Sequence, residues 1–228
     1  MQEKRGGKQI IPRPDSWTEG ESAPWSNISN PQFTIESITR TFSGNTPDPS
    51  SMDSYDRESS VLIALYEFEE QVWMILTRRS ETMRFHTSEV SFPGGNQEPE
   101  DNDPWDTALR EAHEEIGLDP TLPKKIGQLT SFVTVGSNSL VTPFVATLPY
   151  PPELKANTVE VEKILHIPLY ELLSDEVYRE EIWVLRDGKI RSINFFEIVG
   201  DTIWGATGSM IREFLTKLIR IQDTQELT

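Results

Sequence analysis

Three glutamates and an arginine lie within six residues in the stretch LREAHEEIGL, residues 109–118. Glu111, Glu114 and Glu115 have the i, i+3 and i+4 spacing that places side chains on one face of a helix. Glu111 and Glu115 are one helical turn apart, and like charges at that spacing destabilise a helix by about 0.2–0.5 kcal/mol. Two explanations are open: an acidic face solvated by water, or convergent carboxylates that bind a divalent cation.

A glycine-rich loop, SFPGGNQEPEDND at residues 91–103, leads directly into this stretch. Glycine lets a backbone approach its neighbours closely, so carbonyl oxygens of the loop can lie beside the carboxylates. Mg²⁺ prefers such oxygen ligands, and a bound divalent ion neutralises phosphate charge and activates water. The formal net charge of −16 argues against general nucleic-acid binding. A cation would let this acidic chain hold a phosphate ligand.

The glutamates need a helix to bring them together, and the sequence predicts one over residues 104–116. Asn102 or Asp103 can cap its start, Pro104 suits its first turn, and Gly117 suits its end. At 3.6 residues per turn, a separate face collects the residues that we expect in the core: Trp105, Ala108, Leu109, Ala112 and Ile116.

The remaining pattern predicts a sheet with helices packed on it. Alternating β-rich runs predict three hairpins, formed by residues 61–68 with 71–79, by 128–135 with 140–148, and by 181–198 around the turn Asp187-Gly188. A further strand is expected over residues 163–169. Apolar residues at helical spacing predict a helix over 206–221, and a shorter one follows Pro168 through residue 175. This mixture indicates an α/β sandwich.

The ends of the chain differ in composition from its middle. Residues 1–30 are rich in Pro, Ser, Gly and Trp, so we expect an irregular arm anchored by Trp17 and Trp25 to the domain or to a second subunit. Residues 43–60 are expected to form a linker or loop. The predicted organisation is an arm and linker over 1–58, one domain over 59–222 and a tail over 223–228.

Composition also excludes several classes of protein. The chain has no cysteine, which rules out disulfides and thiolate zinc sites. No apolar run approaches the roughly 20 residues of a membrane span, and the first residues lack the apolar region of a signal peptide. We therefore expect a cytoplasmic protein without a membrane partner.

Residues 95–118 resemble the signature of the Nudix hydrolases: Gly, five residues, Glu, seven residues, then R-E-U-x-E-E-x-G-U, where U is aliphatic. The second half matches in full at Arg110, Glu111, Ala112, Glu114, Glu115, Gly117 and Leu118. The first half departs, because Asn102 stands where Glu is expected, and Asp101 becomes the acidic partner if one extra residue is allowed. The resemblance implies the Nudix-type α/β/α sandwich with a mixed central sheet.

The resemblance also implies roles for these residues. Glu111, Glu114 and Glu115 are expected to bind Mg²⁺ or Mn²⁺ and to be catalytic, with the carbonyl of Gly95 as a further ligand. Arg110 is expected to pair with a carboxylate, Asp101, and to orient the loop against the helix. The implied reaction is attack by water on a phosphorus of a diphosphate bond, and the implied substrate is a nucleoside diphosphate linked to another group.

Residues 75–95, ILTRRSETMRFHTSEVSFPGG, resemble the additional signature of the coenzyme A diphosphatase branch. The positions in register are Leu76, Thr77, Arg79, Ser80, Arg84, Phe92, Pro93, Gly94 and Gly95. Ser88 departs, because that signature has Gly there. The branch implies cleavage of coenzyme A or acyl-coenzyme A to 3′,5′-ADP and (acyl-)phosphopantetheine. The residues expected to contact this substrate are Arg79, Arg84, Phe92, Gly94 and His86.

Some assignments stay open between neighbours. Strand alternation puts Arg78 and Arg79 on opposite faces, and we favour Arg79 for the site because it occupies the signature position. Glu160 is the candidate general base, with Glu162 as an equally plausible neighbour. Other possible substrates are ADP-ribose, a dinucleoside polyphosphate or an oxidised nucleotide, and a sensor that binds a nucleotide without hydrolysis is a further alternative. A homodimer formed through the arm is also expected.

Overall fold

The structure is a computed structural model, and it describes residues 4–28, 31–44, 54–81, 88–134 and 136–225. Its centre is an eight-stranded mixed sheet with the order β4-β3-β2-β8-β6, in which β5 pairs with β2, β7 with β8 and β9 with β3. The strands are β2 (Arg57–Phe68), β3 (Gln71–Arg79), β4 (Val90–Ser91), β5 (Gly94–Asn96), β6 (Lys124–Gln128), β7 (Phe132–Val133), β8 (Ser139–Thr147) and β9 (Val161–Pro168). The pairing of β2 with β8 is parallel and the other strand pairs described in this sheet are antiparallel, which confirms the predicted mixed sheet.

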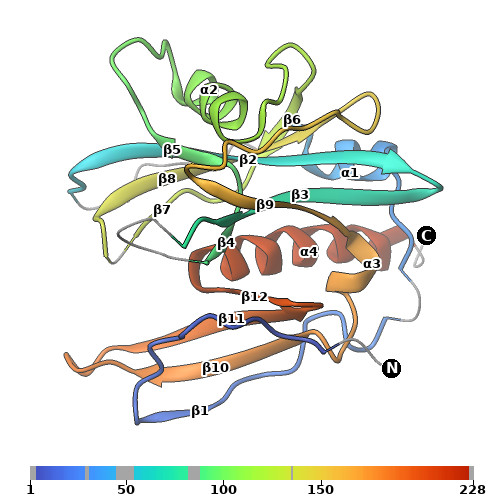
Figure 1. The fold of residues 1–228 in the computed structure, drawn as a ribbon. Helices are drawn as coiled ribbons and strands as arrows, with labels where there is room; N and C mark the ends of the chain where they lie inside the picture. Colours follow the sequence, from blue (N-terminus) through green and yellow to red (C-terminus); the bar gives the residue numbers. More distant parts are fainter. Residues whose placement is uncertain (1–3, 29–30, 45–53, 82–87, 135, 226–228) are drawn as a thin grey trace.

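Helices cover both faces of this sheet (Figure 1). In β2, Leu62 and Ala64 pack toward α2 (Pro104–Ile116), whereas Ile63 and Leu65 belong to a second core on the opposite face. This alternation follows from the two-residue period of a strand. The second core also holds α1 (Ile35–Phe42) and α4 (Gly205–Gln225), whose rings Phe42 and Phe214 stack with centroids 5.2 Å apart. The α/β/α sandwich is confirmed.

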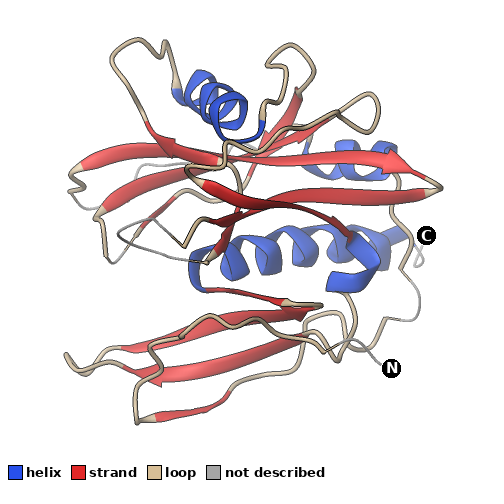
Figure 2. Ribbon diagram, viewed as in Figure 1, coloured by secondary structure: helices blue, strands red, loops and turns tan. Residues whose placement is uncertain are grey.

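A second sheet lies beyond α4, so that this helix is enclosed between two sheets (Figures 1 and 2). Its order is β1-β10-β11-β12, with strands β1 (Trp17–Glu19), β10 (Tyr178–Val184), β11 (Ile190–Ile198) and β12 (Asp201–Trp204). The short helix α3 (Leu169–Leu172) connects the two sheets through the chain. The predicted hairpin over 181–198 therefore exists, but it belongs to this second sheet.

The other predicted elements are found with small changes of length. The first hairpin turns at Glu69 and Glu70, and α2 begins and ends at the predicted residues. The cap of α2 is Asp103, whose carboxylate accepts from the amides of Trp105 and Asp106, and Gly117 ends the helix with φ +66°. The strand predicted over 128–135 is interrupted, because β6 ends at Gln128 and β7 covers only Phe132–Val133.

The prediction that the N-terminal arm lacks regular structure is wrong at residues 17–19, where β1 pairs with β10. α1, which the sequence did not predict, lies between the predicted arm and the predicted linker and begins with a capping box between Thr34 and Ser37. Trp25 is 2% exposed and packs on Tyr178 and Phe196, so it anchors the arm to the domain.

Trp17 and the predicted linker differ from expectation in other ways. Trp17 is 38% exposed and lies under the guanidinium of Arg13, so it is not a core anchor. β2 already begins at Arg57, and therefore residues 57–60 of the predicted linker belong to the sheet. The domain limits 59–222 stay a prediction. Within the described residues, no helix is both long and apolar enough to cross a membrane.

The burial of Trp25 makes the arm part of the fold energetically. Trp25→Ala should lower the free energy of unfolding by about 3 kcal/mol, because it leaves a cavity in the core. Trp17→Ala is the control and should lower it by less than about 1 kcal/mol, because that side chain is partly exposed. Urea denaturation measures both values. Equal small losses would show that the arm is not part of the cooperative unit.

Candidate active site

The three glutamates of α2 do not form a solvated acidic face. Glu115 is 3% exposed, and the side chain of Glu111 is 15% exposed, whereas that of Glu114 is 55% exposed. Two of the three carboxylates are therefore turned into the protein, toward β5 and the end of β3. Water alone does not solvate them.

The glycine loop lies directly against these carboxylates. The amide of Gly94 donates to Oε2 of Glu115 over 3.4 Å. At Gly95, a Cβ atom would come within 2.4 Å of Oε1 of Glu111. Only glycine leaves room for a carboxylate at that distance from the backbone. The loop thus brings peptide groups to the same place as the acidic side chains, as the sequence predicted.

Arg110 joins the loop to the helix. Its Nε and Nη2 bond the two oxygens of Asp101 over 2.9 and 3.0 Å, and its Nη2 also donates to the carbonyl of Asn96 over 2.9 Å. The hydrogen bond from Arg110 holds the pKa of Asp101 down to about 2. The remaining nitrogen, Nη1, contacts Glu111 at 3.1 Å and Glu114 at 3.2 Å. The predicted pairing with Asp101 is therefore present.

The neighbouring arginines of β3 separate to opposite faces, as alternation predicted. Nη1 of Arg79 lies 3.7 Å from Oε1 of Glu115, so Arg79 belongs to the site. Arg78 points away and bonds Asp201 and Glu162. Two further predicted substrate contacts, Arg84 and His86, lie outside the described residues.

Glu160 and Glu162 also separate. The carbonyl of Glu160 accepts from the amide of Ser80 over 2.8 Å, next to Arg79, and the charge of Glu160 contributes to the raised pKa of Glu111 and Glu115. Glu162 is engaged with Arg78 at 3.3 Å on the other side. Because Glu162 pairs with Arg78, we favour Glu160 as the general base.

Burial makes this group of carboxylates difficult to ionise. Burial, with smaller contributions from the charges of Glu111 and Glu160, raises the pKa of Glu115 to about 8 against the opposing effect of Arg79. Burial also raises the pKa of Glu111. A divalent cation would reverse both effects, since it favours the charged form.

The donors suit Mg²⁺ or Mn²⁺ because all of them are oxygens. In the described part of the chain, no three acidic or histidine side chains already converge as a metal site. Arg110 and Arg79 hold carboxylate oxygens that an ion would need. The residues therefore fit an ion that takes over these contacts.

Phe92 and Ser88 are two positions of the additional signature. Phe92 is 2% exposed and packs in the core, so the prediction that its side chain contacts substrate is corrected to a packing role. Ser88 has φ +60°, a left-handed conformation that favours glycine. Serine therefore replaces the signature glycine while the backbone keeps the glycine-type conformation.

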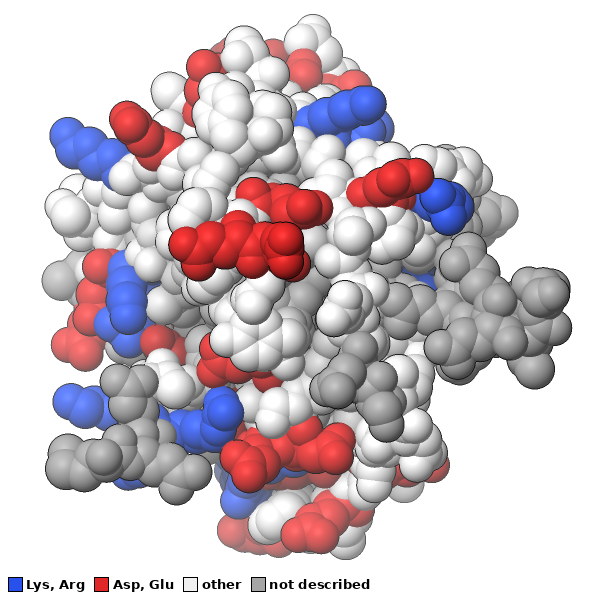
Figure 3. All heavy atoms as spheres, turned by 90° about the vertical axis from the view of Figure 1, so that its right-hand side faces the viewer, with Lys and Arg blue, Asp and Glu red and all other residues white. Residues whose placement is uncertain are grey.

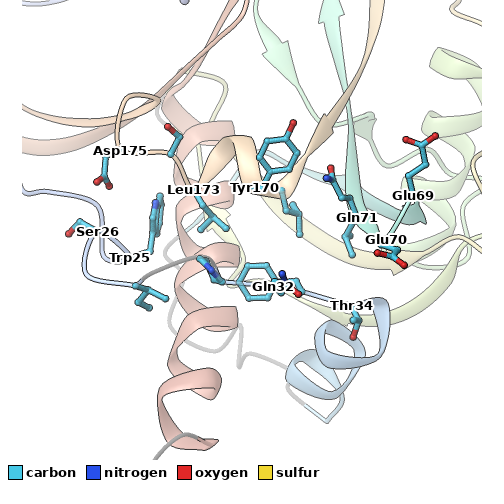
Figure 4. Close-up of a pocket in the computed structure, with 16 residues that line it drawn as sticks. Trp25, Ser26, Gln32, Thr34, Glu69, Glu70, Gln71, Tyr170, Leu173 and Asp175 are labelled. Atoms are coloured by element: carbon cyan, nitrogen blue, oxygen red, sulfur yellow. The ribbon is translucent and has the colours of Figure 1, made fainter.

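A large cavity among the described residues lies away from this site. It has a volume of about 770 Å³ and is bounded by residues from 25–34, 69–72 and 169–175, as Figure 4 shows. It borders the start of β3, whereas Arg79 is at the other end of that strand. Glu69, Glu70 and Asp175 line it, its described lining includes no lysine or arginine, and Figure 3 shows acidic side chains on this face. Such a cavity is unsuited to a polyphosphate.

The raised pKa of Glu115 predicts how stability depends on pH without metal. The folded pKa lies above the unfolded value of 4.5, so stability is full below pH 4.5 and is lost as pH rises through about 8. Glu115→Gln removes this loss. In EDTA at pH 8 to 9, that variant should exceed the wild type in unfolding free energy by about 1–3 kcal/mol.

Chemical denaturation across this pH range measures the effect. Glu114→Gln is the control, because the Glu114 side chain is half exposed. Parallel pH profiles for wild type and Glu115→Gln would contradict the account.

The conformation of Ser88 predicts a stabilising substitution. Ser88→Gly should raise the free energy of unfolding by about 0.5 kcal/mol, because relief of the left-handed penalty outweighs the added freedom of the unfolded chain. Ser88→Ala keeps the Cβ atom and should give no such gain. Thermal unfolding of the two variants is the measurement, and a loss of stability in Ser88→Gly would refute the assigned conformation.

Comparison with known proteins shows the family of this chain. The family model described as NUDIX domain matches residues 56–184. The Nudix hydrolase NudL of Photorhabdus laumondii is 36% identical over 167 residues, covering 73% of this chain and 88% of that protein. Nudix hydrolase 22 of Arabidopsis thaliana, a chloroplastic protein, is 37% identical over 68% of this chain and 53% of its own length.

A solved structure supports the fold. The MutT/nudix family protein from Enterococcus faecalis superposes with a TM-score of 0.50 at 16% identity, covering 75% of this chain and 66% of that protein. The glutamate helix, the glycine loop and the sandwich that holds them are thus found together with a family match over more than half of the sequence. This chain belongs to the Nudix hydrolase family.

Proposed function

We propose that this enzyme cleaves the diphosphate bond of coenzyme A or an acyl-coenzyme A, with Mg²⁺ or Mn²⁺, to 3′,5′-ADP and (acyl-)phosphopantetheine. The observation that carries the chemistry is the buried carboxylate of Glu115 and the partly buried one of Glu111, which lie against the backbone of Gly94 and Gly95. The substrate rests on the signature around Arg79, whose one departure, Ser88, keeps a glycine-type backbone. The alternative substrates are ADP-ribose, a dinucleoside polyphosphate and an oxidised nucleotide, and their hydrolysis would use the same site.

In this proposal Glu111, Glu114, Glu115 and the carbonyl of Gly95 would hold the cation. When bound, the cation neutralises the charge of the diphosphate and makes water more acidic. Arg110 keeps the loop and the helix in register through Asp101, so the ligands stay on one side of the site. This is a structural role, and it needs no contact between Arg110 and substrate.

The remaining residues act on the substrate and the attacking water. Arg79 is paired with Glu115 at 3.7 Å in this structure. If Glu115 binds the cation, Arg79 can pair with a phosphate instead. Its forked donors suit phosphate oxygens. Glu160 accepts the proton of the water as a new phosphorus–oxygen bond forms, and the anhydride oxygen leaves with the second phosphate. A peptide group, that of Gly94, is positioned to donate to the same region.

The location of the protein and its oligomeric state stay predictions. A cytoplasmic location is consistent with the absence of cysteine from the sequence. A homodimer formed through the N-terminal arm would have to use exposed residues such as Trp17, because Trp25 is occupied within its own chain.

Product analysis by chromatography tests the proposed function. Purified protein with Mg²⁺ or Mn²⁺ is incubated with coenzyme A, acetyl-coenzyme A, ADP-ribose, NADH, diadenosine polyphosphates and 8-oxo-dGTP. We expect the highest kcat/KM for coenzyme A or its acetyl derivative, with release of 3′,5′-ADP. Glu115→Gln should lower kcat by about 10³-fold, because a ligand of the cation is lost. Glu100→Gln, an exposed loop residue, is the matched control.

The outcomes separate the alternatives. A higher kcat/KM for another member of the panel would keep the cation site and change the substrate. Near-normal turnover in Glu115→Gln would remove the proposed cation site. Tight nucleotide binding with no turnover at saturating Mg²⁺ would favour a sensor over an enzyme.

A further inference from the structure

Arg78 connects the strand that carries Arg79 to the second sheet. Its Nη1 lies 3.0 Å from Oδ1 and 3.1 Å from Oδ2 of Asp201, at the start of β12. Asp201 is 1% exposed. A buried carboxylate that bonds a guanidinium with both oxygens fixes the direction of that side chain. Arg78 is therefore held on the face of β3 opposite the site.

The same guanidinium reaches the irregular part of the sheet. β3 and β9 are paired with a shift of register: Arg78 faces Lys163 and Arg79 faces Val161, so Glu162 is the extra residue of a bulge. Nη2 of Arg78 lies 3.3 Å from Oε1 of Glu162. Arg78 thus binds the residue that the bulge leaves without a partner. Bulges redirect the side chains next to them.

The residues redirected by this bulge are those of the proposed site. Arg79 follows Arg78 and reaches Glu115, and the amide of Ser80 donates to the carbonyl of Glu160 over 2.8 Å. The amide of Arg79 donates to the carbonyl of Glu89 over 2.9 Å. The position of the bulge therefore determines where Arg79 and Glu160 stand relative to the helix carboxylates.

We propose that Asp201 is a positioning residue for the diphosphate site: through Arg78 it holds the Glu162 bulge and so orients Arg79 and Glu160. The proposal rests on the proposed function of those two residues. Asp201 lies beyond residues 56–184, the part that matches the family model. The second sheet therefore contributes to the site although it is far from it in sequence and carries none of the residues that contact substrate.

Steady-state kinetics of a double-mutant cycle test this coupling. The variants are Asp201→Asn, Arg78→Met and the double variant, with Asp187→Asn on the exposed β10–β11 turn as control. The assay uses the best substrate of the panel at a temperature at which every variant is folded by circular dichroism. Asp201→Asn should raise KM by about fivefold or more, and in the Arg78→Met background it should add less than about twofold, because both act through one path.

A purely structural role gives a different pattern. It would lower the melting temperature of Asp201→Asn and leave KM within about twofold of the wild type at the lower temperature. That result, or effects of Asp201→Asn and Arg78→Met on KM that multiply independently, would overturn the proposal.

Hydrogen exchange supplies a readout that does not need turnover. The amide of Ser80 should exchange faster in Asp201→Asn than in wild type or Asp187→Asn, because its bond to the carbonyl of Glu160 joins β3 to the bulged end of β9. Unchanged exchange would overturn the positioning role even in an active enzyme. If the wild type cleaves no member of the panel while Asp201→Asn still changes the exchange, the proposed function is refuted and the structural coupling stays in place.

Discussion

The burial of Glu115 is the constraint on which the rest of the site depends. An ionised carboxylate that is 3% exposed is unfavourable unless charges or donors compensate it. In this structure the compensation comes from Arg79 and from the amide of Gly94, and it is incomplete, because the pKa of Glu115 stays at about 8. Because the negative charge of Glu115 is only partly compensated by the protein, the site favours a bound cation strongly. The sequence carries three glutamates at helical spacing, and the fold buries Glu115 and partly buries Glu111.

Three arginines lie around the glutamate carboxylates, and two of them are paired mainly with other residues. Arg110 is committed to Asp101 and the loop carbonyl of Asn96, so it stabilises the approach of the loop to α2. Arg78 is committed to Asp201 on the far side of the sheet. Arg79 alone among these three contacts Glu115, and it does so at 3.7 Å, beyond hydrogen-bonding distance. Among the contacts that the structure describes for these three, the arginine best placed to exchange a carboxylate for a phosphate is therefore the one with the longest contact.

Sequence patterns predicted the parts of this structure that local rules control. The helix over 104–116 was found with its limits because Asp103, Pro104 and Gly117 are strong boundary signals. The shared face of the glutamates follows from helical spacing, whereas the pairing of Arg110 with Asp101 was implied by the resemblance to the Nudix signature.

The features that were missed depend on distant contacts. The partner of Arg78 is 123 residues away and has no local signal. The burial of Phe92 and the pairing of β1 with β10 are set by packing against residues elsewhere in the chain. The bulge at Glu162 depends on the register between two strands, which the sequence of one strand does not specify.

The most direct measurement of the central claim is anomalous diffraction from crystals of the protein soaked in Mn²⁺. The account predicts a peak in contact with carboxylate oxygens of Glu111 and Glu115 and with the carbonyl of Gly95. A map with no peak there at saturating Mn²⁺, or with its strongest peak away from α2, would contradict it.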